Sequence, residues 1–371
     1  MGLMYLTFII ILFVLAGSDL IVGVSNDAVN FLNSAIGSKV STRRVIMLVA
    51  SVGILLGALF SSGMMEVARK GVFHPEMFTF SQVMVIFMAV MLTDILLLDL
   101  FNTFGMPTST TVSIVFELLG AAVAVSAIQI LSSGQSISEL SAYVNSSRAL
   151  LIIGGIFLSV IIAFGVGTIA QFSSRIIFGF KYKKRIKLFG SVWGGLALTV
   201  LSYFLIIKGL NGASFVTEAF LSWVTGNTVL LLLISMVFWT ILLQFLLAFT
   251  RMDILKVIVL AGTLSLAMAF ASNDLVNFIG VPMAGIESFL TWNGQNVAAD
   301  QFLMTSLAGK VMTPSSWLAI AGGIMILTLW FSKKARTVTE TEINLSRQIE
   351  GKEAFKPHFV ARGIVKGVSR V

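Results

Sequence analysis

The chain of 371 residues contains no cysteine, only two histidines and few charged side chains. The absence of cysteine excludes disulfides and thiolate metal sites and leaves the redox compartment open. The histidines, His74 and His358, are too few and too far apart in the sequence to suggest a zinc or haem site. Charged residues make up 11% of the chain, whereas a typical soluble domain carries roughly 25%. The chain is therefore not an ordinary soluble protein.

Apolar residues make up 57% of the chain, and long runs of them recur along its whole length. Such runs predict membrane spans, because a helix of about 20 apolar residues crosses a bilayer. Helix is the expected state, since lipid-exposed backbone must satisfy its own hydrogen bonds and the runs are too long for barrel strands. The expected spans are 4–23, 45–65, 82–101, 112–131, 150–172, 189–207, 228–250, 255–271 and 317–332. The sequence therefore predicts an all-α, polytopic protein of the inner or plasma membrane.

Lysine and arginine concentrate in a few short loops, and this bias orients the chain in the membrane. The densest cluster lies in 173–188, which predicts a cytoplasmic loop. Counting spans from it places the loops near Arg43 and Lys333 on the same side. The net charge of +8 therefore describes loops at a membrane surface and predicts no nucleic-acid partner.

One motif occurs twice, as "VSNDAVNF" at 24–31 and "ASNDLVNF" at 271–278, with six of eight positions identical. With the orientation above, the span that carries the first copy enters from outside and the span that carries the second enters from the cytoplasm. Copies that run in opposite directions are typical of the inverted repeats of secondary transporters.

Each copy of the motif places a carboxylate and two amides in an apolar region. A charged side chain near mid-bilayer costs about 2.5–3.5 kcal/mol on insertion scales, so these groups are candidates for function. Each aspartate follows one asparagine and precedes another three positions later, on the same helix face. The residues are Asn26, Asp27, Asn30, Asn273, Asp274 and Asn277.

Serines before the motifs predict that the helices break there. Ser25 and Ser272 are expected to cap short helices that end at Gly37 and at 280–282. Broken, re-entrant helices would expose backbone groups, which is tolerated where they line a polar cavity. The alternative is a pair of ordinary helix caps in loops at the membrane interface.

A second polar group occurs in "FNTFGMPTSTTVSIVFELLGAA", residues 101–122. Gly105 is expected to end one helix, and Pro107 is suited to the first turn of the next. The hydroxyls of 108–111 would then lie beside the free N–H groups of a helix start, which favours an oxyanion. The alternative is a Ser/Thr-rich cap without a ligand. Two roles stay open for Asp94, Asp99 and Glu117: a part in coupling transport to a cation or proton, or a structural position where the carboxylate is solvated.

Four segments together resemble the inorganic phosphate transporter (PiT) family: "GVSNDAVNFLNSAIGSKV" (23–40), "GMPTSTTVSIVFELLGAA" (105–122), "ASNDLVNFIGVP" (271–282) and "GKVMTPSSWLAIAGG" (309–323). The resemblance implies an inverted-repeat fold that imports phosphate with Na+ or a proton. It implies a substrate site at Asn26, Asn30, Ser109, Thr110, Thr111, Asn273 and Asn277, with Asp27 and Asp274 as the cation ligands.

The sequence departs from the family pattern at three places. Serine precedes Asn-Asp in both copies, Val112 stands where family members often have histidine, and the second Pro-x-Ser-Thr-Thr hairpin of the family does not occur. The missing second hairpin predicts that the chain is the front portion of a longer transporter. The expected organisation is a first repeat (1–172), a basic loop (173–188), connecting helices (189–250), the start of a second repeat (251–332) and a polar cytoplasmic tail (333–371).

The leading hypothesis is a secondary transporter that imports phosphate by alternating access. Its expected partners are phosphate, Na+ or a proton, and the lipid bilayer; no further cofactor is expected, and homo-oligomerisation stays open. The alternatives are a transporter of another oxyanion, such as sulfate, and a membrane receptor or scaffold that does not transport. No enzyme motif occurs, such as His-Glu-x-x-His, Gly-x-Ser-x-Gly or a Walker loop, so no enzyme activity is expected.

Overall fold

The computed structural model describes residues 2–60, 72–179, 182–212, 216–250, 252–308 and 313–345, together with isolated positions beyond 358. His358, most of the expected tail and part of the 309–323 motif lie outside these residues. The described chain is helical throughout, and its strand-like pairing is confined to isolated bridges.

The longer helices are α1 (Gly2–Gly37), α2 (Arg43–Leu59), α4 (Phe80–Phe104), α5 (Thr110–Ser132), α7 (Ser146–Phe178), α8 (Tyr182–Gly212), α9 (Glu218–Gly226), α10 (Thr228–Phe249), α11 (Ile254–Asn293), α12 (Ser315–Phe331) and α13 (Lys333–Leu345). The short elements are η1 (Pro75–Met77), η2 (Ile137–Glu139), α6 (Leu140–Tyr143) and η3 (Thr305–Ala308). Each expected span falls on one of the longer helices, apart from the last residues of 45–65, which lie outside the described residues. Within the described residues, seven helices are long and apolar enough to cross a membrane, or up to eight if the bent pair α12–α13 counts as one span. The prediction of an all-α, polytopic membrane protein is confirmed.

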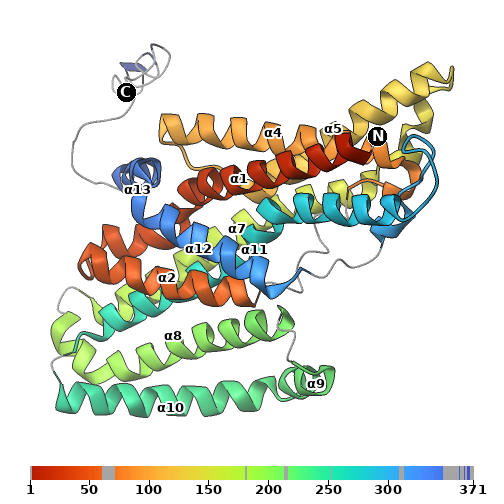
Figure 1. The fold of residues 1–371 in the computed structure, drawn as a ribbon. Coiled ribbons are helices and arrows are strands. Elements are labelled where there is room, and N and C mark those ends of the chain that lie inside the picture. Colours follow the sequence, from red (N-terminus) through yellow and green to blue (C-terminus); the bar gives the residue numbers. More distant parts are fainter. Residues whose placement is uncertain are drawn as a thin grey trace.

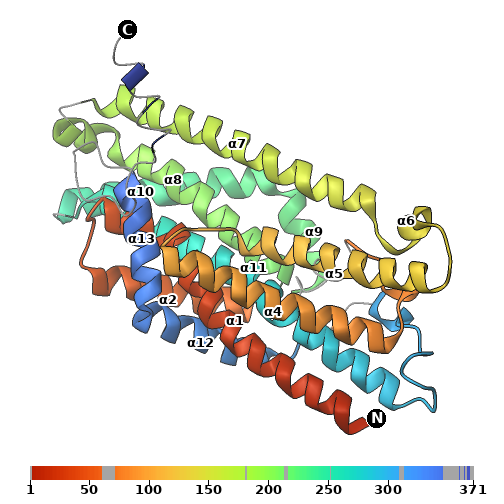
Figure 2. The ribbon, with the colours of Figure 1, turned by 90° about the horizontal axis from the view of Figure 1, so that it is seen from above.

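The two motif-bearing helices, α1 and α11, lie side by side at the centre and run in opposite directions (Figure 1). Helices α2 and α12 pack on one side of them, and α4 and α5 form a hairpin on the other. Helices α8 and α10 pair with each other, and α8 also contacts α11. Figure 2 shows α7 along one edge, where only its two terminal regions contribute buried residues. Both copies of the motif therefore lie next to each other at the centre of the fold.

Glycines allow the central helices to approach closely. A side chain on Gly23 of α1 would collide with the ring of Phe278 on α11. Gly53 and Gly57 of α2 lie against α11, where a Cβ on Gly53 would be 2.5 Å from the Leu264 carbonyl oxygen. Small residues four positions apart permit such backbone contact between membrane helices. These contacts determine how the second motif faces the first.

The helices do not break at the motifs, which corrects one expectation. Ser25 and Ser272 lie inside α1 and α11, where their hydroxyls donate to the carbonyls of Ile21 (2.6 Å) and Ala269 (3.0 Å) instead of capping a new helix. The region 280–282 does not end α11 either, although Pro282 lacks an N–H for the helical ladder. The helix does end at Gly37, as expected.

The break among the described helices occurs instead at Ser332, where α12 and α13 meet at 66°. Polar side chains at the motifs find partners on other helices, as described below, so the backbone has no need to open there. The hydroxyl of Ser332 accepts from the N–H of Ala335 at 3.1 Å, which starts the new helix.

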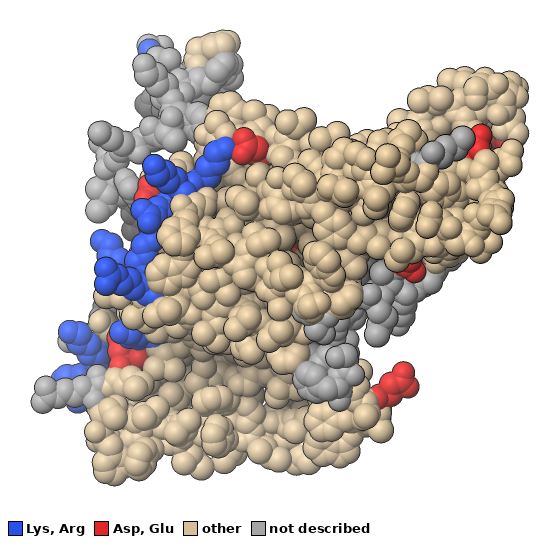
Figure 3. Space-filling view, in the orientation of Figure 1, with Lys and Arg blue, Asp and Glu red and all other residues tan. Residues whose placement is uncertain are grey.

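Lysine and arginine side chains gather at one end of the molecule (Figure 3). This end is where α1 and α10 finish and where α2, α8 and α13 begin (Figure 1). The expectation that the basic loops share one side is confirmed by this arrangement. The assignment of this end to the cytoplasm follows from the positive-inside rule and stays a prediction.

Candidate functional site

The tip of the α4–α5 hairpin lies against the first motif. Helix α4 ends at Gly105, whose φ of 67° is left-handed and suits glycine. Ser109 then caps α5 by accepting the N–H of Val112 at 3.3 Å. The expected helix end and the hydroxyl-rich helix start are therefore present. Pro107 lies in the turn before the cap rather than in the first helical turn, because capping by Ser109 begins the helix at Thr110.

Asn26 joins α1 to this tip through three hydrogen bonds. Its Nδ2 donates to Oδ1 of Asn102 (2.8 Å) and to the carbonyl of Met106 (3.1 Å). Its Oδ1 accepts the backbone N–H of Thr108 at 2.7 Å. Asn102 in turn donates to the carbonyl of Val22 at 2.7 Å. The fully buried Asn26 amide therefore positions the hairpin tip, with both of its N–H groups used by protein partners.

Asp27 is the next residue and is almost completely buried, at 3% exposure. Its Oδ2 accepts the hydroxyl of Thr110 at 3.0 Å, and its Oδ1 accepts Nδ2 of Asn30 at 3.4 Å. Asp274 of α11, also 3% exposed, lies beside it, close enough for the two carboxyl groups to share a hydrogen bond when one carries a proton. The duplicated motif thus brings its two carboxyl groups together between antiparallel helices.

The second motif contacts the same hairpin through one residue. Asn277 is buried, and its Nδ2 donates to Oγ1 of Thr111 at 3.1 Å. Asn273 is exposed on α11, unlike its counterpart Asn26, and does not join this group. The structure therefore assembles eight of the nine expected residues around the hairpin tip: Asn26, Asp27, Asn30, Ser109, Thr110, Thr111, Asp274 and Asn277.

Helix α13 covers this group on the basic side. Its preceding residue Ser332 hydrogen-bonds Ser25 through their hydroxyls at 2.7 Å, and Nζ of Lys334 lies 2.6 Å from the Asp99 carboxylate. A Cβ on Gly105 would lie 3.0 Å from Cγ2 of Thr337, so the hairpin tip also touches α13.

Sequence reasoning missed this contact, because 333–371 was expected to be a polar tail. The signal that could have found it is the three- and four-residue spacing of Ala335, Val338 and Thr339, which is typical of a helix with one buried face. Asn102 was likewise not among the expected site residues, although a lone amide in an apolar run needs a buried partner.

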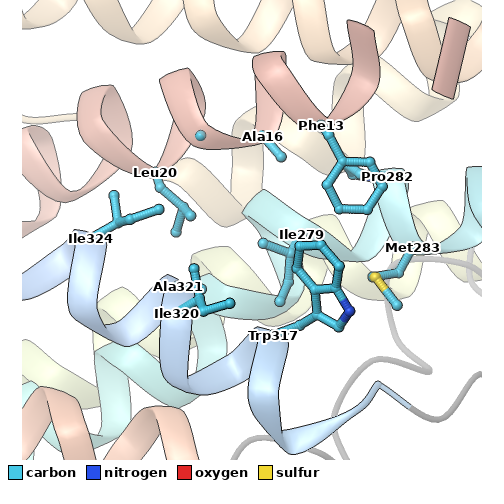
Figure 4. Close-up of a pocket in the computed structure, with 11 residues that line it drawn as sticks. Phe13, Ala16, Leu20, Ile279, Pro282, Met283, Trp317, Ile320, Ala321 and Ile324 are labelled. Atoms are coloured by element: carbon cyan, nitrogen blue, oxygen red, sulfur yellow. The ribbon is translucent and has the colours of Figure 1, made fainter. Parts of the chain in front are cut away.

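A cavity of about 90 Å³ between α1, α11 and α12 does not belong to the site (Figure 4). Its lining consists of apolar side chains, among them Phe13, Leu20, Ile279 and Trp317. An anion could find only the indole N–H there, whereas an oxyanion site needs several donors. A larger hollow of about 580 Å³ between α4 and α5 is different, because Thr108, Ser109, Ser113 and Glu117 contribute polar groups to its wall.

The solved structure of a sodium-dependent phosphate transporter has a similar fold. It superimposes with a TM-score of 0.63 over 94% of this chain and 80% of its own, at 18% identity. In sequence, a candidate phosphate permease of Thermococcus kodakarensis is 24% identical over 309 residues, which cover 81% of this chain and 69% of the permease. A candidate phosphate permease of Pyrococcus abyssi is 25% identical over 311 residues, with the same coverage.

The family model of the phosphate transporter family matches residues 23–340. The match begins just before the first Asn-Asp motif, continues through the hairpin and the second motif, and ends within α13. It thus contains every residue of the assembled group as well as the first part of the helix that covers it. The resemblance seen in the sequence is confirmed, and the chain belongs to the phosphate transporter family.

Proposed function

We propose that this chain imports inorganic phosphate together with a cation, Na+ or a proton, by alternating access. The observation that carries the proposal is the buried pair of Asp27 and Asp274 beside the hydroxyl-rich start of α5. Family membership supports phosphate as the substrate, and it confirms the expectation that the chain is not an enzyme.

The two carboxyl groups favour a cation between them. Two like charges 4 Å apart repel by about 4 kcal/mol at an effective dielectric constant of 20, so both can ionise only when a positive charge offsets the repulsion. Both residues are buried, which adds a desolvation cost to any uncompensated charge. A sodium ion or a proton at this position removes both costs.

Phosphate would bind next to this cation, at the hairpin tip. The first turn of α5 provides backbone N–H groups, and Ser109, Thr110 and Thr111 add hydroxyl donors. Among the described residues, neither lysine nor arginine contributes to this group, so the anion depends on the bound cation for charge compensation. This dependence gives a physical basis for coupled transport, because neither ion is stable in the site alone.

The antiparallel arrangement of α1 and α11 supports alternating access, since related helices of opposite direction can expose a common site to either side in turn (Figure 1). The solved transporter that shares the fold is sodium-dependent, which makes Na+ the first ion to test. The chain is an integral membrane protein by its helices and its family. Its placement in the plasma or inner membrane belongs to the proposal, and homo-oligomerisation stays a prediction.

The test is uptake of labelled phosphate by a bacterial host that lacks its own phosphate transporters, with and without sodium. We expect Asp27→Asn and Asp274→Asn to abolish uptake, because an amide cannot provide the charge that holds the cation. Asp300→Asn is the matched control, since Asp300 is exposed and lies beyond the end of α11, outside both motifs. Full uptake by both motif variants would refute the proposed site, and uptake of sulfate in place of phosphate would favour the alternative substrate.

A further inference from the structure

A second group of buried carboxyl groups lies apart from the Asn-Asp pair. Asp19 is on α1, eight residues before Asp27, which corresponds to about 12 Å along a helix. Asp94 on α4 and Glu117 on α5 lie beside it. Asp19 and Asp94 are both 0% exposed, and Glu117 is half-buried. The three residues come from three different helices and meet in the apolar interior.

The three side chains are short of hydrogen-bond donors. Ser113 donates its hydroxyl to Oε1 of Glu117 at 2.6 Å. Among the described residues, both oxygens of Asp19, both of Asp94 and Oε2 of Glu117 are buried without a partner that donates to them. Asp94 nevertheless lies within hydrogen-bonding range of the other two carboxyl groups, provided that one of each pair carries a proton. Ionisation of all three groups would therefore need a compensating positive charge close to them.

Among the residues that the structure describes, no basic side chain acts on the cluster to supply this charge. The titratable groups that act electrostatically on the cluster are its own members and Asp27 of α1, all of them acidic. Helix α11 contributes Asp274, which lies beside Asp27, and α12 has no titratable residue. Three ionised carboxylates in this position would repel one another in a medium of low dielectric constant.

A metal ion fits the cluster less well than a proton. Within the described part of the chain, no group of three or more Asp, Glu or His side chains has the geometry to hold a metal ion. A proton needs only two carboxyl oxygens within hydrogen-bonding range, and Asp94 has such a neighbour on each side. Carboxyl groups that are held this close share protons, as paired carboxylic acids in other proteins do.

We propose that Asp19, Asp94 and Glu117 form a proton-binding site, separate from the Asn-Asp pair, that keeps at least one proton between its carboxyl oxygens. The proton passes from water to a carboxylate oxygen and returns by the same route, so that no further reactant is needed. The hollow between α4 and α5 provides this route, because Glu117 and Ser113 line it and it extends to Thr108 and Ser109 at the hairpin tip.

The site also provides a link to transport, and this part rests on the proposed function. Asp19 and Asp94 act electrostatically on Asp27, so a proton in the cluster makes the potential at Asp27 less negative. Cation binding at the Asn-Asp pair therefore weakens when the cluster gains a proton, and by reciprocity a bound cation favours release of that proton.

Infrared difference spectroscopy of the full-length protein in lipid nanodiscs tests the site directly, since a protonated carboxyl group has its own C=O stretch. We expect a carboxyl band that titrates with pH, and we expect Asp94→Asn and Glu117→Gln each to remove or shift it. Ser113→Ala should shift the same band, because it removes the hydroxyl that donates to Glu117. Glu139→Gln, at an exposed carboxyl near the opposite end of α5, is the matched control and should leave the band unchanged.

Two results would overturn the proposal. The first is a band that remains the same in both carboxyl variants. The second is a band that sodium removes at constant pH in the Asp27→Asn variant, whose Asn-Asp pair no longer holds the cation, because this would identify a metal-ion site in the cluster instead. Asp27→Asn separates this proposal from the proposed function, because it should abolish phosphate uptake and keep the cluster's band. Uptake that survives Asp27→Asn refutes only the transport site, whereas loss of the band in that variant refutes the separation of the two sites.

Discussion

Helix α13 packs against the site through a few contacts. We predict that weakening these contacts exposes the buried face of α13. Val338 is fully buried, and Lys334 pairs with Asp99 at 2.6 Å while both side chains are close to half exposed. Truncation of Val338 to alanine removes two buried carbon groups at about 0.8 kcal/mol each, or ~1.6 kcal/mol. Loss of the exposed ion pair adds only about 0.2–1 kcal/mol. The double variant Val338→Ala/Lys334→Ala should therefore lose about 2 kcal/mol of α13 attachment.

The absence of cysteine makes this change measurable. Thr339 is 3% exposed in the attached helix, so a single Thr339→Cys substitution reports on detachment when a thiol reagent reaches it from the basic side in inside-out vesicles. A loss of about 2 kcal/mol changes a two-state population by roughly 30-fold, and labelling that samples the open form should accelerate by a similar factor.

Lys333→Ala in the same Thr339→Cys background is the control, because Lys333 is exposed and lies next to the same contacts. The reasoning is refuted if the double variant labels at the rate of this control. Fast labelling in the unmodified Thr339→Cys protein would also contradict it, since that would mean that α13 is not attached in the membrane. Labelling from the opposite side only would reverse the orientation that the basic residues predict.

Three further variants test the contacts at the centre of the fold. Asn26→Ala should lower the melting temperature more than Asn277→Ala does. It leaves several buried groups without a hydrogen-bond partner, at about 1–3 kcal/mol each, whereas Asn277 makes one bond to the hairpin. Equal melting temperatures of the two variants in a thermal scan would contradict this. Gly57→Ala should cost about 1–3 kcal/mol through collision with the Met268 carbonyl, whereas Gly120→Ala, which meets no neighbouring atom, should cost much less in the same scan. Thr110→Val keeps the shape of the buried side chain but removes the hydroxyl that donates to Asp27. We expect a loss of about 1.5–3 kcal/mol in the free energy of cation binding, or roughly ten- to a hundredfold in affinity in a sodium titration of uptake. An unchanged sodium dependence would exclude this contact from the site.

Local patterns were sufficient to predict the elements of the fold and most of the residues that meet at the hairpin tip. Apolar runs determine membrane helices because lipid leaves the backbone no other hydrogen-bond partner, and the expected spans fall on α1, α2, α4 and their successors. The cap at Ser109 and the helix ends at Gly37 and Gly105 were likewise readable, since each depends on residues within one turn. The repeated Asn-Asp motif pointed to Asp27 and Asp274 before their contact was known.

The tertiary structure decided which polar groups meet and whether the helices continue through them. Whether α1 breaks at Ser25 depends on a hairpin some 80 residues away, because Asn102 and Thr108 satisfy Asn26 without any opening of the backbone. The cluster of Asp19, Asp94 and Glu117 and the docking of α13 depend in the same way on helix packing. The physical reason is that a sequence shows that a buried polar group needs a partner, but only the packed helices determine which partner comes within reach.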